Sequence, residues 1–75
     1  MVNVVVNETK EVITRIQKAF KQKEEGIIIY NIENLDEKML KTISKRCPFI
    51  RCMVSGDTSI QIVFDKSAYA NSASR

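Results

Sequence analysis

The apolar residues of this 75-residue chain follow two different periods, and the order of these periods limits the folds that the chain can adopt. An apolar residue at every second position is typical of a strand, whereas apolar residues spaced three and four apart form one stripe along a helix. The successive runs are residues 2–6 (strand), 12–20 (helix), 27–32 (strand), 35–47 (helix), 49–54 (strand) and 59–64 (strand). The sequence therefore predicts the element order β-α-β-α-β-β.

Residues with known preferences at helix ends support both predicted helices. Thr9 precedes the first helical run, where its hydroxyl is expected to accept a hydrogen bond from a first-turn amide, and Gly26 is expected to stop that helix. Asn34, followed three residues later by Glu37, has the spacing of a capping box at the start of the second helix. Pro48 is expected to end the second helix, because the residue before a proline avoids the helical region.

The second strand and the helix before it predict the topology. Residues 27–32 are apolar at nearly every position, as in a strand that is covered on both faces or lies at the centre of a sheet. A helix that connects two neighbouring strands forms a right-handed crossover, so strands 2–6 and 27–32 are predicted to be parallel. The Gly56-Asp57 turn predicts a hairpin for the last two strands. We expect an α/β fold, a two-layer α+β sandwich with both helices on one face of a four-stranded mixed sheet.

The length of the chain predicts one domain over residues 1–66, and the small, polar, aperiodic stretch 67–75 is expected to be a flexible tail. A domain this small buries only about 60% of the surface of its unfolded chain, so self-association would add to its stability. Branched residues on both faces of the last strand favour a homodimer interface there. The residues predicted for this interface are Ile60, Ile62 and Phe64.

The two cysteines, Cys47 and Cys52, are expected to be free thiols in a reducing compartment. If the segment between them is extended, its ends lie about 16 Å apart, whereas a disulfide needs Cα atoms within about 7 Å. The chain has no histidine, so neither a zinc site nor another cofactor is predicted.

The sequence lacks the motifs of the common catalytic sites. It has no histidine, no glycine-rich phosphate loop and no nucleophile elbow. Asp36 and Glu37 are adjacent at a predicted helix start and point in different directions, so they make a poor acid–base pair. Arg46 is expected to lower the pKa of Cys47, but a thiolate without a base is a weak nucleophile candidate. We therefore do not expect an enzyme.

No apolar run approaches the roughly 18 residues that span a bilayer, and the N-terminus lacks the basic and apolar regions of a secretory signal. We expect a cytoplasmic protein with no membrane partner and no small-molecule substrate. The formal charge of +3 is only mildly basic, so the positions of the charges are more informative than their sum.

The opening stretch NVVVNETKEV, together with the element order, resembles the Alba family of small nucleic-acid-binding proteins. In that family an apolar strand leads through a short lysine-bearing turn into the first helix, and Lys10 matches the lysine of that turn. Lys38, in Glu37-Lys38-Met39-Leu40, matches a lysine in the second helix of the family. The resemblance implies a homodimer that lays its body on a duplex. The same element order occurs in the C-terminal domain of bacterial translation initiation factor three, so both DNA and RNA are candidate ligands.

Basic residues follow the outer faces of both predicted helices. If the helices cover the same side of the sheet, these residues form one surface that binds phosphates with little sequence preference. Solvated helix faces are often basic without a ligand, and acidic residues at the helix starts dilute the positive field. Tyr30 and Phe49 are candidates for stacking on bases, although an aromatic residue within an apolar strand is more often part of the core. The residues predicted to bind nucleic acid are Lys10, Arg15, Lys18, Lys38 and Lys41.

The alternative function is a small protein-interaction module, such as an adaptor or an inhibitor, that binds no nucleic acid. Its apolar last strand would then dock a partner protein. Two features favour this alternative. The turn before the second helix carries Glu33, where the Alba family has basic residues, and the hairpin turn 55–58 is short and has no lysine or arginine.

Overall fold

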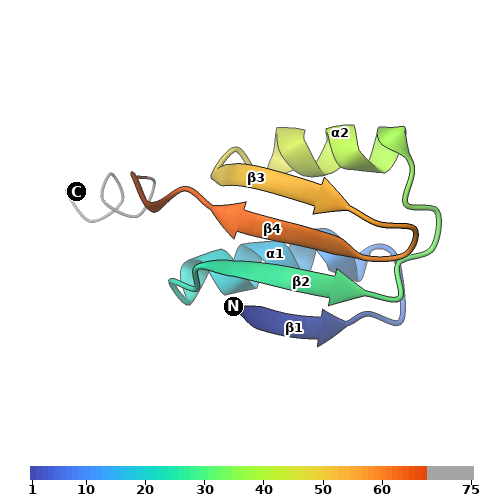
Figure 1. Cartoon of the computed structure of the whole chain (residues 1–75), viewed down its shortest axis with the longest axis horizontal. Helices are drawn as coiled ribbons and strands as arrows, with labels where there is room; N and C mark the ends of the chain where they lie inside the picture. The colour runs from blue at the N-terminus through green and yellow to red at the C-terminus, as the bar shows by residue number, and fades with distance from the viewer. Residues whose placement is uncertain (68–75) are drawn as a thin grey trace.

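A computed structural model describes residues 1–67 of the chain and has the predicted order of elements (Figure 1). The elements are β1 (Val2–Val5), α1 (Glu11–Lys21), β2 (Gly26–Tyr30), α2 (Glu37–Arg46), β3 (Ile50–Ser55) and β4 (Ile60–Phe64). The predicted α+β class with a four-stranded mixed sheet is confirmed. The predicted tail, 67–75, lies outside the described residues except for Ser67. No helix within residues 1–67 is long and apolar enough to cross a lipid bilayer.

The four strands lie in the order β1-β2-β4-β3 across the sheet (Figure 1). β1 and β2 are parallel, as the crossover through α1 predicts, and Val4 lies opposite Ile29. β4 is antiparallel to both β2 and β3, so the predicted hairpin is confirmed. The register of β3 shifts between Ile50 and Cys52, which places Arg51 in a β-bulge. The last strand of the chain is therefore central, and β1 and β3 form the edges of the sheet.

Both helices pack on one face of the sheet, and the core lies between the two layers. Alternate residues of β2 and β4 are buried with the inward stripes of α1 and α2, and in Figure 1 helix α1 lies behind the strands. The core cluster comprises Val6, Val12, Ile16, Ala19, Ile27, Ile29, Ile32, Ile43, Cys47, Ile60, Ile62 and Phe64. Within residues 1–67, no helix lies over the opposite face of the sheet.

The predicted dimer interface is wrong, because its three residues belong to the core of the protomer. Ile60, Ile62 and Phe64 point toward the helices from the central strand β4 and are 1%, 0% and 2% exposed. The sequence correctly indicated an apolar face on this strand, but the two helices of the same protomer already cover that face. A second protein cannot contact these side chains while the protomer is folded.

Helix α1 begins without the predicted threonine cap. Its N-cap residue is Lys10, which makes no side-chain capping bond. The Thr9 hydroxyl instead donates to the carbonyl oxygen of Glu33 at 3.3 Å. Thr9 therefore links the two loops that precede the helices.

Helix α2 begins two residues after the predicted cap. Asp36 is its N-cap residue, and Asp36 Oδ1 accepts a hydrogen bond from the Met39 amide at 2.9 Å. Asn34 lies in the preceding turn with a φ of 55°, a left-handed conformation that asparagine tolerates well. The end of α2 agrees with the prediction, because Cys47, the residue before Pro48, has left the helical region with a φ of −127° and a ψ of 72°.

Gly26 does not stop α1 but is the first residue of β2. The turn after α1 is made by Lys23, which has a φ of 60°. A Cβ atom at Gly26 would collide with the main-chain carbonyl oxygen of Ile62 on β4. The glycine is therefore needed for the close approach of two neighbouring strands.

Candidate nucleic-acid interface

After the first residue of each helix, both helices carry basic residues and no acidic ones. Residues 12–21 and 38–46 contain seven lysine or arginine residues and no aspartate or glutamate. Glu11 and Glu37 lie in the first turns, where the helix dipole favours a negative charge. The buried stripes of the helices are apolar, so the seven cationic side chains belong to the outer surface of the helix layer. They are Arg15, Lys18 and Lys21 on α1 and Lys38, Lys41, Lys45 and Arg46 on α2.

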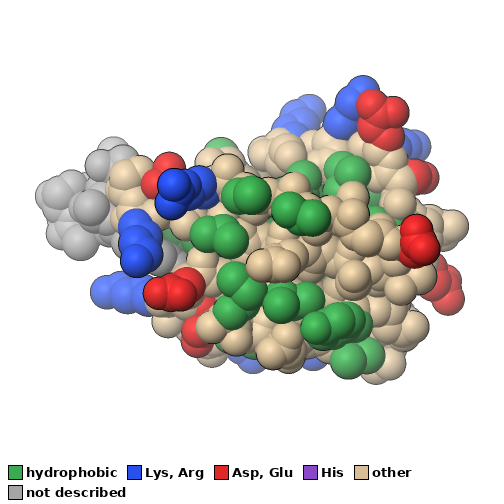
Figure 2. All heavy atoms as spheres, viewed as in Figure 1, with side chains coloured by type: hydrophobic (Ala, Val, Ile, Leu, Met, Phe, Trp, Pro, Cys, Tyr) green, Lys and Arg blue, Asp and Glu red, His purple; other side chains and the backbone are tan. Residues whose placement is uncertain are grey.

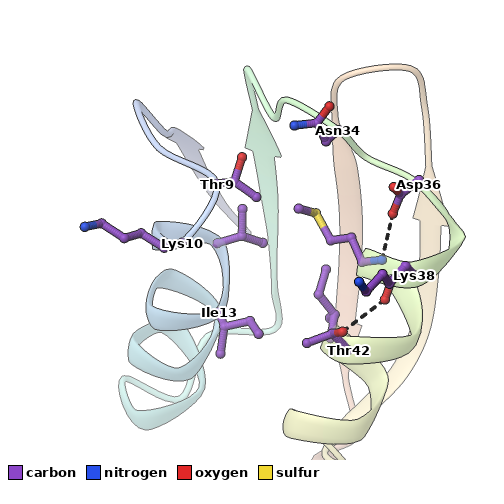
Figure 3. A pocket seen from close by; sticks show the side chains of 10 residues that line it. Thr9, Lys10, Ile13, Asn34, Asp36, Lys38 and Thr42 are labelled. Carbon is purple, nitrogen blue, oxygen red and sulfur yellow. Dashed lines mark hydrogen bonds between the residues drawn. The ribbon is translucent and has the colours of Figure 1, made fainter.

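A groove of about 320 Å³ separates the N-terminal halves of the two helices (Figure 3). Its apolar lining comes from both helices, with Val12 and Ile13 on α1 and Met39 and Ile43 on α2. Polar and charged residues complete the lining: Thr9, Lys10, Asn34, Asp36, Lys38 and Thr42. The groove is therefore an apolar cleft with charged groups at its rim.

Phenylalanine packing joins the helix layer at the other end of the groove. The ring of Phe20, in the last turn of α1, stacks on the ring of Phe49, which follows α2, with centroids 3.9 Å apart. Both rings meet Phe64 of β4 edge-on, with centroids 5.7 Å apart. The C-terminal ends of the helices are thus bridged by aromatic contacts, whereas their N-terminal ends flank the groove.

Lys10 and Lys38, one from each helix start, line the same groove. The side chain of Lys10 points away from the groove along the outer side of α1 (Figure 3). Its Nζ atom lies 3.3 Å from Glu8 Oε2, and both side chains are largely exposed. An exposed ion pair of this kind contributes little and is screened by salt, so it leaves Lys10 able to exchange Glu8 for a phosphate.

Arg15 and Lys18 lie on the side of α1 that faces the edge strand β1. Together with Val2 and Val4 of that strand, they line a shallow hollow that is separate from the groove. The structure therefore does not bring these two residues beside Lys38, and the cations of the helix layer form two rows, one on each helix.

The row on α2 comprises Lys38, Lys41 and Lys45, which line one shallow hollow with Glu37 and Thr42. The Nζ atom of Lys41 lies 4.0 Å from Glu37 Oε1 in an exposed pair one helical turn apart. Lys45 was not among the residues predicted to bind. Its helical spacing from Lys38 and Lys41, at positions three, four and seven residues apart, is the signal that marks it as a member of the row.

The two aromatic residues proposed for base stacking have different positions. Phe49 is half-buried and packed in the phenylalanine cluster, so it is unavailable for stacking. Tyr30 is 42% exposed on the face of the sheet that has no helix over it, and its hydroxyl donates to Asn3 Oδ1 at 3.4 Å. Tyr30 therefore does not lie with the cationic rows.

Glu11 fastens the turn before α1. Its Oε2 atom accepts hydrogen bonds from the main-chain amides of Asn7 at 2.9 Å and Glu8 at 3.1 Å. These two bonds hold the pKa of the Glu11 carboxyl below its ordinary value, with smaller contributions from the charges of Arg15 and Lys10.

A Glu11→Gln substitution is expected to lower the thermal midpoint at neutral pH, because the charged carboxylate is the better acceptor. A lowered folded-state pKa means that this stabilisation is present above the ordinary pKa of 4.5 and is lost as the pH falls through the folded-state value. The midpoints of variant and wild type should therefore converge in acid. The same substitution at Glu33, an exposed loop carboxylate, is the control and should have a smaller effect at neutral pH. Parallel midpoint curves for Glu11→Gln and wild type down to strong acid would contradict this role.

Both cysteines are free thiols, Cys47 buried and Cys52 exposed. The expected lowering of the Cys47 pKa by Arg46 is wrong: burial raises the pKa of this thiol, and the charge of Arg46 offsets that effect only in part. Cys47 is thus a packing residue. Among residues 1–67, no group of histidine, cysteine, aspartate and glutamate side chains is arranged to hold a metal ion.

No protein-family model, curated protein or solved structure matches the chain.

Proposed function

We propose that this protein binds the phosphate backbone of DNA or RNA through the outer surface of its helix layer, with little sequence preference. The observation that best supports this function is the charge of the two helices. Residues 12–21 and 38–46 contain seven lysine and arginine side chains and no carboxylate. Two cationic rows on neighbouring helices can each follow a phosphate chain, and the counterions released there favour binding. The similarity of the NVVVNETKEV stretch to the Alba family supports the same function.

The helix layer is suited to contacts with phosphates and poorly suited to reading bases. Its cations are long side chains on regular helices, all exposed except the half-buried Arg15. Neither helix presents an aromatic ring to solvent in the described residues, since Phe20 is packed against Phe49. Contacts of this type position a nucleic acid on the protein but do not recognise its base sequence. We also propose a cytoplasmic location, because two free thiols are typical of a reducing compartment.

The test is a double charge reversal that takes one residue from each row, Lys18→Glu with Lys38→Glu. We expect affinity for a random-sequence duplex at low salt to fall about tenfold or more. The slope of log affinity against log salt should become shallower by about 0.9 for each lost contact, as counterion release requires. Fluorescence anisotropy with a duplex, a single strand and an RNA hairpin at several salt concentrations measures both quantities.

Lys66→Glu is the matched control for the two single reversals, Lys18→Glu and Lys38→Glu, because each of the three changes the net charge by the same amount and Lys66 is an exposed lysine outside both rows. Its effect should be small beside that of either single reversal. Equal weakening by Lys66→Glu and by the two single reversals would show that net charge, not the helix layer, governs binding. Absence of binding to all three nucleic acids at low salt would favour the protein-interaction module instead.

A further inference from the structure

The sheet face that carries no helix is apolar at its centre. Its outward side chains include Val5, which is 65% exposed, Val54, which is 61% exposed, and the exposed Tyr30. Ile28 and Val63, also apolar, lie between them on the two central strands. Figure 2 shows hydrophobic side chains over the middle of this face and charged side chains around its periphery.

This composition departs from that of a sheet face exposed to water. In a two-layer fold the strand residues that point away from the helices are normally polar, which gives alternation along each strand. Here the only polar residues that alternate onto this face within the paired region are neutral, Asn3 on β1 and Gln61 on β4. An apolar face of this kind on a small domain marks an interaction surface.

We infer that this face packs against the same face of a second copy of the chain, in a two-fold dimer of sheets. The distribution of charge at the two ends of β3 indicates that the partner is a second copy. Arg51 lies in the bulge at its start, and Asp57 lies in the hairpin turn at its end. The loops after β2 and β3, which lie at the same end of the sheet, contain acidic residues and no basic ones.

A two-fold axis that lies between the sheets and perpendicular to the strands places each end of one sheet over the opposite end of the other. Arg51 of one copy then faces Asp57 of the second copy, and the same contact is repeated across the axis, as an isologous interface requires. An axis parallel to the strands would instead place the β3 edge of one copy over the β1 edge of the second and bring the same ends of the two sheets together, so that the acidic loops after β2 and β3 of both copies would lie at one end of the dimer. Charge complementarity thus selects one of the two arrangements.

The area of the sheet predicts a weak dimer. Four strands about 4.8 Å apart and about 17 Å long have a footprint of about 300 Å², which is small beside the roughly 800 Å² per partner of a standard interface. Association is therefore expected between low micromolar and near-millimolar protein concentration, and it needs the apolar centre of the face to be intact.

Sedimentation velocity across this concentration range tests the inference with variants that keep the protomer folded. Val54→Lys and Val54→Glu place opposite charges at an exposed edge-strand position, and each should weaken association about tenfold or more. Similar losses for opposite charges would show that Val54 is buried in the dimer. Circular dichroism establishes that both variants are folded. A single-protomer mass for the wild type at every concentration would overturn the inference and would favour a different protein as the partner of this face.

A charge swap tests the identity of the occupant. Arg51→Glu and Asp57→Arg should each weaken association, and the double variant should restore it, because these residues lie at opposite ends of β3 and meet only between copies. Failure of the double variant to recover association would exclude this two-fold arrangement.

The two thiols supply a further readout in the unmodified protein. Maleimide labelling of the exposed Cys52, whose strand position lies opposite Val63, should slow as protein concentration rises, while the buried Cys47 stays unreactive as an internal control. A labelling rate for Cys52 that is independent of concentration would contradict the dimer. The Val54 variants should keep salt-dependent binding to nucleic acid per protomer. A loss of dimerisation can therefore be distinguished from a loss of nucleic-acid binding by the helix layer.

Discussion

Replacing Phe64 with alanine is expected to lower the free energy of unfolding by about 4 kcal/mol, a large part of the stability of a domain this small. The Phe64 ring is 2% exposed and contacts the rings of Phe20 and Phe49, which bridge the ends of the two helices. β4 lies between β2 and β3, so it cannot move inward to fill the space that the ring leaves. Urea unfolding followed by circular dichroism measures the change.

Val54→Ala is the control for this prediction, since it shortens an apolar side chain on the neighbouring strand that is 61% exposed. Its effect is expected to stay within about 0.5 kcal/mol in the monomer. A Phe64→Ala protein with wild-type stability and altered self-association would contradict the core position and restore Phe64 to an interface.

The order and the pairing of the elements could be predicted from the sequence because each follows from local periodicity. The nearly continuous apolar run that contains Ile27 and Ile29 correctly indicated a central strand, and the helix before it correctly indicated a parallel neighbour. The helix starts were harder to predict. Asn34 and Asp36 are both good capping residues two positions apart, and the choice between them depends on backbone geometry that the sequence does not contain.

Less of the candidate interface than of the fold could be predicted from the sequence. The lysines of each helix could be assigned to an outer face from their spacing, but the distance between the two rows depends on how far apart the helices pack. The helix starts are separated by the groove that Ile13 and Met39 line, and this separation is a result of tertiary packing. Similarly, Ile62 has the pattern of an apolar strand face, and only the sheet order shows that the two helices already cover it.

The proposed dimer and the proposed function use opposite sides of each protomer. If two sheets pack face to face, the layers follow the order helix, sheet, sheet, helix, and both cationic helix layers point outward. A dimer of this kind presents two separate phosphate-binding surfaces on opposite sides and is able to hold two nucleic-acid segments at once. Binding by a dimerisation-deficient Val54 variant should then retain its affinity per protomer but lose the capacity to bridge two duplexes.

Gly26→Ala is expected to destabilise the protein by about 3 kcal/mol, at the upper end of the cost of overpacking. Its Cβ atom would collide with the carbonyl oxygen of Ile62, a main-chain atom of the paired strand β4 that cannot rotate away. Relief requires β2 and β4 to separate where Gly26 lies opposite Val63, which disturbs the centre of the sheet. Gly56→Ala is the matched control, because the nearest atom to its new Cβ is the Ser59 side-chain oxygen at 3.1 Å, and a side chain can move. Its effect should be smaller than about 1 kcal/mol. Chemical unfolding of the two variants in parallel measures the difference, and equal stabilities would show that the close approach of the two strands does not require a glycine.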